Sequence, residues 1–333
     1  MITLETLNTL SVDAFTEILG TIFEHSPWVA QRASAARPFT SRLQLLDVMR
    51  GVVQKATVEE QLALIRAHPQ LGARGRKRLE LTEASSREQR RAGLDACTDE
   101  EFAALMRLNT AYVGKFSFPF ILAVRGHDPR SILESMQSRI GNDEERERHT
   151  ALTQIGLIGG YRLADVVASP PEAEATAMVE RLAAAAEGAT AALLREWMLA
   201  ANFDVYQGDT SRLLGVNAQF PRYLVIGIFY DPTTQALYPD GRLATVLGIA
   251  VAQHLRQEQT PTRLGLLVMA TPAAPQPGSI LLELEQPVEL VPTQIDARIT
   301  DQCLTVVHEP TALPEGSAAA IDRAVRTLEH LLI

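Results

Sequence analysis

The stretch Thr57-Val-Glu-Glu-Gln-Leu-Ala-Leu-Ile-Arg-Ala-His68-Pro69 shows which kind of fold the first half of the chain adopts. Val58, Leu62 and Ile65 recur at positions i, i+4 and i+7, which places apolar side chains on one face of a helix. Thr57 and Glu60 have the spacing of a capping box, and Pro69 disfavours helix at the residue before it. The stretch therefore predicts one amphipathic helix that ends at His68.

The same apolar spacing recurs from about residue 10 to 166. Ser85-x-x-Glu88 and Thr98-x-x-Glu101 have the form of further capping boxes, and breaks are expected at Pro27, Pro38 and Pro119. We therefore predict that the first half is nearly all helical.

Composition indicates a globular protein of more than one domain. The chain has 333 residues, which exceeds what one hydrophobic core usually organises, and 46% of them are hydrophobic against 21% charged. The net charge of −9 and the lack of a basic stripe argue against a nucleic-acid partner. We therefore start from two domains and expect no nucleic-acid partner.

Other features bear on where the protein works. The start of the chain has no basic segment of the kind that opens an export signal, and no window approaches about 18 uninterrupted apolar residues. Cys97 and Cys303 are far apart and form neither a disulfide framework nor a zinc-ligand set. We therefore expect a cytoplasmic protein that does not associate with a membrane.

The pattern changes after a short proline-containing joint at 168–172, and we place a linker at 169–175. Beyond it, strands are expected at 223–230 and 263–269 with a helix at 243–255 between them, which makes a β-α-β unit. Further strands are expected at 279–285, 288–291 and 303–308, and a last helix at 317–332. The predicted fold class is multidomain: an all-α domain at 1–168 and an α/β domain at 176–333.

Three groups of residues in the first half could carry chemistry, although each also has a purely structural interpretation. His68 has a side chain suited to proton transfer near neutral pH, yet a histidine at a helix end is often structural. Ser85 and Glu88 could only cap a helix, and the aromatic residues at 116, 118 and 120 could only fill the core. Taken one at a time, none of these groups establishes a function.

Taken together, however, these segments resemble one family in order and spacing. They are Glu24-His25-Ser26-Pro27-Trp28, His68-Pro69-Gln70-Leu71-Gly72, Ser85-x-x-Glu88-Gln89, Lys115-Phe-Ser-Phe-Pro-Phe-Ile121 through Gly126, and Gln154-Ile155 through Arg162-Leu163. Residues 8 to 168 resemble the 2-oxo-4-hydroxy-4-carboxy-5-ureidoimidazoline (OHCU) decarboxylases. No catalytic position of the family pattern is altered in this sequence.

The resemblance implies a cofactor-independent, all-α lyase of urate breakdown, usually dimeric, that forms (S)-allantoin without a metal. It implies that His68 is the acid/base group and that Glu88 orients His68 or holds a substrate hydroxyl or ring N–H. It also implies a substrate-binding set made of Ser85, Gln89, Pro69, Phe120, Ile121 and Arg162. Lys115 is left open as a further contact. Hydroxyisourate hydrolase and urate oxidase are expected as functional associates.

The second half resembles a different family over about residues 176 to 270, the two-metal amidohydrolases that act on allantoate, which have a metallopeptidase-like fold. Phe229 stands where these enzymes have a metal-binding histidine, and Ala244 where they have a bridging aspartate. No Glu-Glu pair follows the strand expected to end at Met269, and Asp231 lacks a neighbouring ligand. Because such a hydrolase needs these side chains to hold its ions, we expect a truncated and catalytically inactive domain.

The sequence therefore favours an active OHCU decarboxylase with an inactive second domain that serves dimerisation, stabilisation or docking. Two alternatives stay open at this stage. The whole chain could be a scaffold without catalytic activity, or the second half could be a module that senses allantoin or allantoate.

Overall fold

The computed structural model describes residues 1–72, 82–185, 189–207, 213–216, 222–230, 239–260, 265–272 and 280–285. They divide into two compact units. Residues 2–39 and 44–166 form one, which we call the helical unit. Residues 1, 40–43 and the described residues from Val167 onwards form the other, which we call the second unit.

The described part of the helical unit consists of helices apart from one short strand, which confirms the all-α prediction. Its elements are β1 (Ile2–Thr3), α1 (Leu4–Thr9), α2 (Val12–Leu19), α3 (Pro27–Ala33), the 3-10 helix η1 (Ser34–Ala36), α4 (Arg42–Gln54), α5 (Val58–Ala67), α6 (Glu83–Arg91), α7 (Asp99–Phe116), α8 (Pro129–Arg139) and α9 (Glu144–Val166).

Local sequence explains where these helices begin. Thr57 and Thr98 each accept a hydrogen bond from the N–H group three residues on and complete the predicted capping boxes of α5 and α7. The predicted box at Ser85 is wrong, because α6 begins at Glu83 and Thr82 is its N-cap. The Ser85 hydroxyl instead donates to the Glu24 carboxylate at 3.1 Å, so it is used for a long-range contact.

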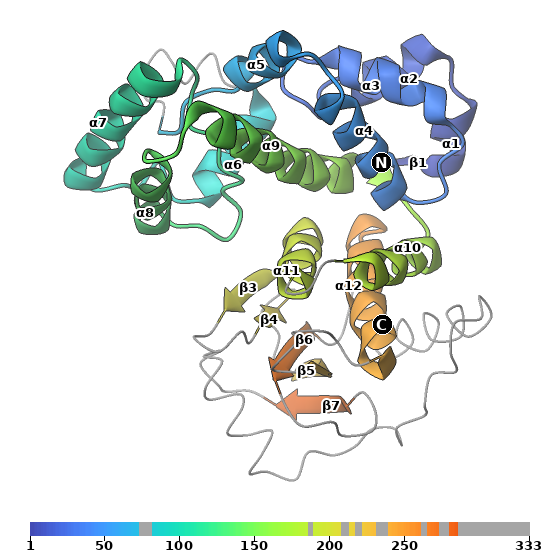
Figure 1. The fold of residues 1–333 in the computed structure, drawn as a ribbon. Coiled ribbons are helices and arrows are strands. Elements are labelled where there is room, and N and C mark those ends of the chain that lie inside the picture. Colours follow the sequence, from blue (N-terminus) through green and yellow to red (C-terminus); the bar gives the residue numbers. More distant parts are fainter. Residues whose placement is uncertain are drawn as a thin grey trace. The chain divides into compact units, whose positions relative to one another are not determined.

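Helix α9 runs through the middle of the helical unit (Figure 1). One of its close approaches depends on glycine, because a Cβ atom on Gly159 would lie 3.1 Å from Cζ of Phe23. Phe23 and Leu163 are both almost fully buried in this core. The packing of α9 brings Arg162, near its end, into the interior of the unit.

The second unit contains helices and strands. Its elements are β2 (Val167–Ala168), α10 (Pro171–Ala184), α11 (Thr190–Ala200), β3 (Asp204–Gln207), β4 (Leu213–Val216), β5 (Arg222–Tyr230), α12 (Pro239–Gln257), β6 (Gly265–Pro272) and β7 (Ile280–Glu285). Helix α10 begins at Pro171, inside the segment 169–175 that was expected to be a linker.

Strands β3 to β7 form one sheet in the order β3-β4-β6-β5-β7. Strands β5 and β6 are parallel, with Tyr223 opposite Gly265, and the helix α12 connects them. This confirms the predicted β-α-β unit, although β6 continues to Pro272 and does not end at Met269. Helix α12 packs beside β5 and β6, and α11 beside β3 and β4 (Figure 1).

Buried residues of α10, α11 and α12 form the described core of this unit, among them Met178, Trp197 and Val251. The segments 288–291, 303–308 and 317–332, for which strands and a helix were predicted, lie outside the described residues. Among the helices that the structure describes, none combines the length and the apolar character needed to cross a membrane.

Candidate active site

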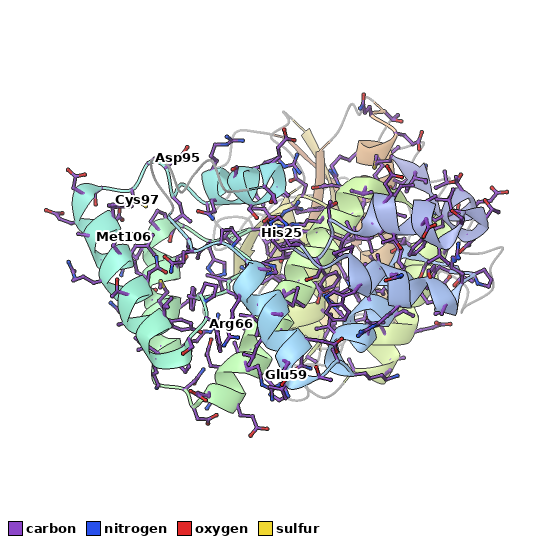
Figure 2. All side chains as sticks on the ribbon, turned by 90° about the horizontal axis from the view of Figure 1, so that it is seen from above. His25, Glu59, Arg66, Asp95, Cys97 and Met106 are labelled. Carbon is purple, nitrogen blue, oxygen red and sulfur yellow. The ribbon has the colours of Figure 1, made fainter. Side chains whose placement is uncertain are left out.

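His68 lies at the C-cap of α5, in extended backbone with φ −78° and ψ 139°. The following Pro69 favours this conformation and ends the helix. Figure 2 labels Glu59 and Arg66, which lie near the first and the last residue of α5. His68 is therefore held on the rigid end of a helix.

The ring of His68 has a defined tautomer. Its Nδ1 lies 3.0 Å from the Leu64 carbonyl oxygen, and because a carbonyl oxygen only accepts, Nδ1 carries the proton. In the neutral ring, Nε2 then holds a lone pair. Nε2 is buried and has no hydrogen-bond partner among the described residues. His68 thus presents an unused proton acceptor.

Burial also fixes the charge of His68. Removal of its ring from water lowers the pKa of His68 to about 4, and the Leu64 carbonyl and the Glu24 carboxylate offset this only in part. The nearby Arg162 and His25 lower the pKa further. At neutral pH the imidazole is therefore uncharged and acts as a base before it can act as an acid.

Arg162 connects two carboxylates beside this histidine. Its Nε donates to Glu88 Oε1 at 3.0 Å and its Nη2 to Glu88 Oε2 at 3.1 Å, which is a two-point contact. Its Nη1 donates to Glu24 Oε2 at 2.6 Å, and Nη2 also donates to the Ser85 hydroxyl at 3.1 Å. The guanidinium thus fixes the orientation of Glu88, Glu24 and Ser85 at the same time.

The charges of this cluster stabilise one another. Burial alone would raise the pKa of Glu24, but the charge of Arg162 and its hydrogen bond outweigh burial and lower the Glu24 pKa below its usual value. Burial would likewise lower the pKa of Arg162, yet its contacts with Glu88 and Glu24 raise it. Glu24 and Arg162 are therefore a buried ion pair at neutral pH.

His68, Ser85, Glu88 and Arg162 line one pocket in the helical unit. Its lining combines polar and apolar residues: His68, Pro69, Leu71, Ser85, Glu88, Gln89, Phe120, Ile121, Leu122, Val124, Ile158 and Arg162. All eight residues that the sequence predicts as catalytic or substrate-binding are in this set. The structure therefore brings the predicted residues together, from α5, α6, α9 and the segment after α7.

Gln89 also has partners within the chain, as Ser85, Glu88 and Arg162 do. Gln89 Oε1 accepts from the Gly72 N–H at 3.0 Å and its Nε2 donates to the Gln70 carbonyl at 3.4 Å, so its amide holds the segment that follows His68. Arg162 is occupied by the two carboxylates described above. Lys115 is not in the pocket lining, and its Nζ donates to the carbonyls of Ile140 and Asn142 at 2.7 Å each.

Sequence reasoning missed Glu24 as part of this site. It lies between α2 and α3, outside any helix, and only 2% of its surface is exposed. Helical periodicity gives no signal there, although the Glu24-to-Trp28 segment is one of those that carry the family resemblance. A carboxylate that directly follows the apolar residues Ile22 and Phe23, shortly before a predicted break at Pro27, is the feature that could have identified it.

The described residues do not include a cluster of three or more His, Cys, Asp or Glu side chains placed to hold a metal ion. In the helical unit, the buried and neutral His68 lies beside the carboxylates of Glu24 and Glu88, whose orientation Arg162 fixes. Groups of this kind, in a pocket of a helical unit, suit an enzyme that uses acid–base chemistry.

Comparisons with known proteins identify the family. The family model described as OHCU decarboxylase matches residues 8–164. The chain is 42% identical over 164 residues to the 2-oxo-4-hydroxy-4-carboxy-5-ureidoimidazoline decarboxylase of Haloferax volcanii, an alignment that covers 49% of this chain and 95% of that protein. The chain belongs to the OHCU decarboxylase family.

Two further comparisons each cover about half of the chain. The uric acid degradation bifunctional protein PucL of Bacillus subtilis is 38% identical over 174 residues, which is 52% of this chain and 34% of that protein. A crystal structure of OHCU decarboxylase in the presence of (S)-allantoin aligns over 46% of this chain and 95% of its own, with 22% identity and a TM-score of 0.37.

The family match ends at residue 164, before the second unit. The resemblance of that unit to two-metal amidohydrolases therefore stays a prediction. Phe229 lies in β5 and Ala244 in α12, whereas Asp231 lies outside the described residues.

Proposed function

We propose that the helical unit converts OHCU to (S)-allantoin in urate degradation, with His68 as the acid/base group. The observation that carries this proposal is the unpartnered Nε2 of His68, which borders the same pocket as the Glu88–Arg162 ion pair. The reaction is inferred from membership in the OHCU decarboxylase family, and the pocket contains side chains that suit this reaction.

The reaction needs an electron sink and one proton carrier. In OHCU, C4 bears the hydroxyl and the carboxylate, and the ureido-bearing C5 is doubly bonded to a ring nitrogen. When the bond from C4 to the carboxylate breaks, its electron pair forms a C4–C5 double bond, and the imine pair moves to that nitrogen. CO2 leaves, and the nitrogen takes one proton from solvent. The product at this stage is an enol.

His68 suits the second half of the reaction. Its Nε2 can accept the proton of the C4 hydroxyl, and the resulting imidazolium can return a proton to C5, which yields the carbonyl at C4 and the stereocentre at C5. Delivery from one side of the pocket gives one hand of allantoin. A positioned acid/base group of this kind contributes about 10²- to 10⁴-fold in rate.

We assign the other pocket residues supporting roles. Arg162 holds the Glu88 carboxylate as a fixed acceptor for a substrate hydroxyl or N–H, and Ser85 offers a second polar contact. Pro69, Phe120 and Ile121 form the apolar and backbone walls of the pocket. Gln89 lines the pocket as well and fixes the segment from His68 to Gly72, because its amide binds the Gly72 N–H. Arg162 reaches a substrate carboxylate only if it gives up part of its contact with Glu88.

Turnover of freshly generated OHCU by His68→Ala tests these roles. His149 is a matched control, because its Nδ1 also lies 3.0 Å from the carbonyl four residues earlier, but on an exposed face of α9. We expect His68→Ala to lose about 10²-fold or more in kcat and His149→Ala to keep full activity. A folded His68→Ala with normal kcat would remove His68 from the mechanism.

We further propose that the chain works in the cytoplasm as a homodimer, in association with hydroxyisourate hydrolase and urate oxidase. Support for the association comes from the uric acid degradation bifunctional protein that matches about half of this chain. Light scattering coupled to size-exclusion chromatography tests the oligomeric state, and a monomeric mass would contradict the dimer.

For the second unit we propose a structural role without catalysis, in dimerisation, stabilisation or docking. Phe229 and Ala244 support this, because neither side chain is a metal ligand and both stand where the amidohydrolase resemblance requires one. Hydrolysis of allantoate by the full chain, above a metal-free control, would contradict it.

A further inference from the structure

One wall of the pocket is not helical. Helix α7 ends at Phe116, Ser117 adopts left-handed backbone with φ 59°, and Pro119 prevents the helix from resuming. Phe120, Ile121 and Leu122 of this segment line the pocket. A wall without helical hydrogen bonds must be held by other groups if it is to keep one shape.

Arg139, the last residue of α8, contacts this wall twice. Its Nη1 donates to the Ile121 carbonyl at 2.7 Å, and its guanidinium lies 4.4 Å from the centroid of the Phe120 ring. Tyr112 packs edge-on against the same ring, with centroids 5.2 Å apart. Phe120 is therefore fixed from two sides.

Glu147 fixes Arg139 in turn. Its side chain is fully buried, and its Oε1 accepts from Arg139 Nε at 3.0 Å and from Nη2 at 2.5 Å. The same carboxylate accepts from the Tyr112 hydroxyl and from Asn142 Nδ2, the latter at 2.6 Å. This hydrogen-bonded set spans α7, α8 and α9, of which α7 and α8 lie side by side (Figure 1).

The geometry of this set depends on arginine. Its planar fork donates two hydrogen bonds to the same oxygen of Glu147 and still has Nη1 for Ile121, while the flat face covers Phe120. A lysine at the same place keeps the charge, but its single ammonium cannot make all three contacts. The requirement for shape as well as charge distinguishes a positioning role from simple charge neutralisation.

We propose that Arg139, oriented by the buried Glu147, is a positioning residue that sets the Phe120–Ile121 wall of the reaction pocket. The inference rests on the proposed decarboxylase function and extends it to a pair of residues outside the pocket lining. A displacement of this wall misplaces the substrate relative to His68 Nε2, and misplacement of about 1 Å can cost 10²-fold in rate.

Arg139→Lys in the full chain tests this, with Arg130→Lys as the matched control. Arg130 lies on the same helix and pairs with Glu134 at 3.0 Å, but its side chain is 84% exposed. We expect Arg139→Lys to lower kcat/KM for OHCU by about tenfold or more, and Arg130→Lys to leave it within about twofold. We also expect faster amide hydrogen exchange at residues 120–123 in Arg139→Lys, with α5 unchanged.

The outcomes separate the two proposals. A wild-type chain that does not turn over OHCU overturns the proposed function, and hydrogen exchange at 120–123 then decides alone whether Arg139 holds the wall. Unchanged exchange there, or unchanged kcat/KM in an active enzyme, overturns the positioning role. If Arg139→Lys does not fold, Arg139→Gln replaces it, because its amide can still donate to Ile121. Failure of both variants to fold assigns Arg139 to the fold and not to the pocket.

Discussion

His68 shows how one residue can be prepared for chemistry by burial. The ring is neutral because it is out of water, and its Nδ1–H is used by Leu64, so the remaining nitrogen of this pocket-lining residue is left as an unpartnered base. The same burial makes the stability of the folded chain depend on pH.

The pKa of His68 is about 4 in the folded chain and 6.5 in its ordinary state. Above pH 6.5 the ring is neutral in both folded and unfolded chains. Below it, the unfolded chain binds a proton that the folded chain does not, so the free energy of unfolding falls by about 2 kcal/mol between pH 6.5 and 5. Urea denaturation at several pH values gives the free energy of unfolding of the wild type and of His68→Asn. We expect this free energy to fall more steeply from pH 6.5 to 5 in the wild type than in His68→Asn. Equal slopes would contradict a neutral buried His68.

Glu24 makes a second prediction at this scale. Glu24→Gln removes the charge that faces Arg162 inside the unit, and loss of one partner of a buried ion pair costs about 3 kcal/mol or more. The matched control is Glu134→Gln on the surface of α8, for which we expect less than about 0.5 kcal/mol. Chemical denaturation measures both. A Glu24→Gln variant as stable as the control would mean that Glu24 is not charged in the folded chain.

The sequence predicts much of this site but not its contacts. His68, Ser85, Glu88, Gln89 and Arg162 could be named because the family motifs keep their order and spacing. Their partners could not, because hydrogen bonds such as Arg162 to Glu24 join residues 138 positions apart. Such pairing depends on how α9 packs, which no local pattern determines.

At the scale of elements, the segment between His68 and Gly72 depends on one glycine. Gly72 has φ 75°, and a Cβ there would lie 2.4 Å from Leu105 Cδ2. Gly72→Ala should destabilise the chain by about 1–2 kcal/mol and lower kcat, because the segment positions Pro69 and Leu71 in the pocket.

Gly51 provides the control for that prediction. It lies within α4, and nothing comes within 4 Å of a Cβ added to it, so Gly51→Ala should stabilise the chain by up to about 1 kcal/mol. Thermal unfolding of the two variants should therefore shift in opposite directions. A shift of Gly72→Ala in the same direction as Gly51→Ala would contradict the strained turn.

Element boundaries were predictable where the signal is local. The capping boxes at Thr57 and Thr98 are confirmed because cap and helix lie within three residues of each other. Ser85 was misassigned because its side chain bonds to a distant carboxylate, which the same S-x-x-E spacing cannot reveal. The β-α-β unit followed from apolar runs, whereas its antiparallel neighbours β4 and β7 depend on pairing between distant segments.

At the scale of the whole molecule, every residue of the pocket lining belongs to the helical unit. We therefore expect residues 1–168 alone to turn over OHCU with a kcat/KM within about threefold of the full chain, provided that the fragment folds. In the full chain, Arg42 Nη2 lies 3.3 Å from Glu174 Oε2 within the second unit. Because the fragment lacks Glu174, we expect it to be somewhat less stable than the full chain. A folded but inactive fragment would show that the second unit takes part in catalysis.

The central claim is that this chain makes (S)-allantoin with His68 as its acid/base group. Circular dichroism of allantoin formed from freshly generated OHCU tests it most directly, with the wild-type chain, His68→Ala and buffer compared. We expect rapid growth of the (S)-allantoin signal with the wild type and none above buffer with His68→Ala. A wild-type chain that gives no more (S)-allantoin than buffer would contradict it and favour a scaffold without catalytic activity.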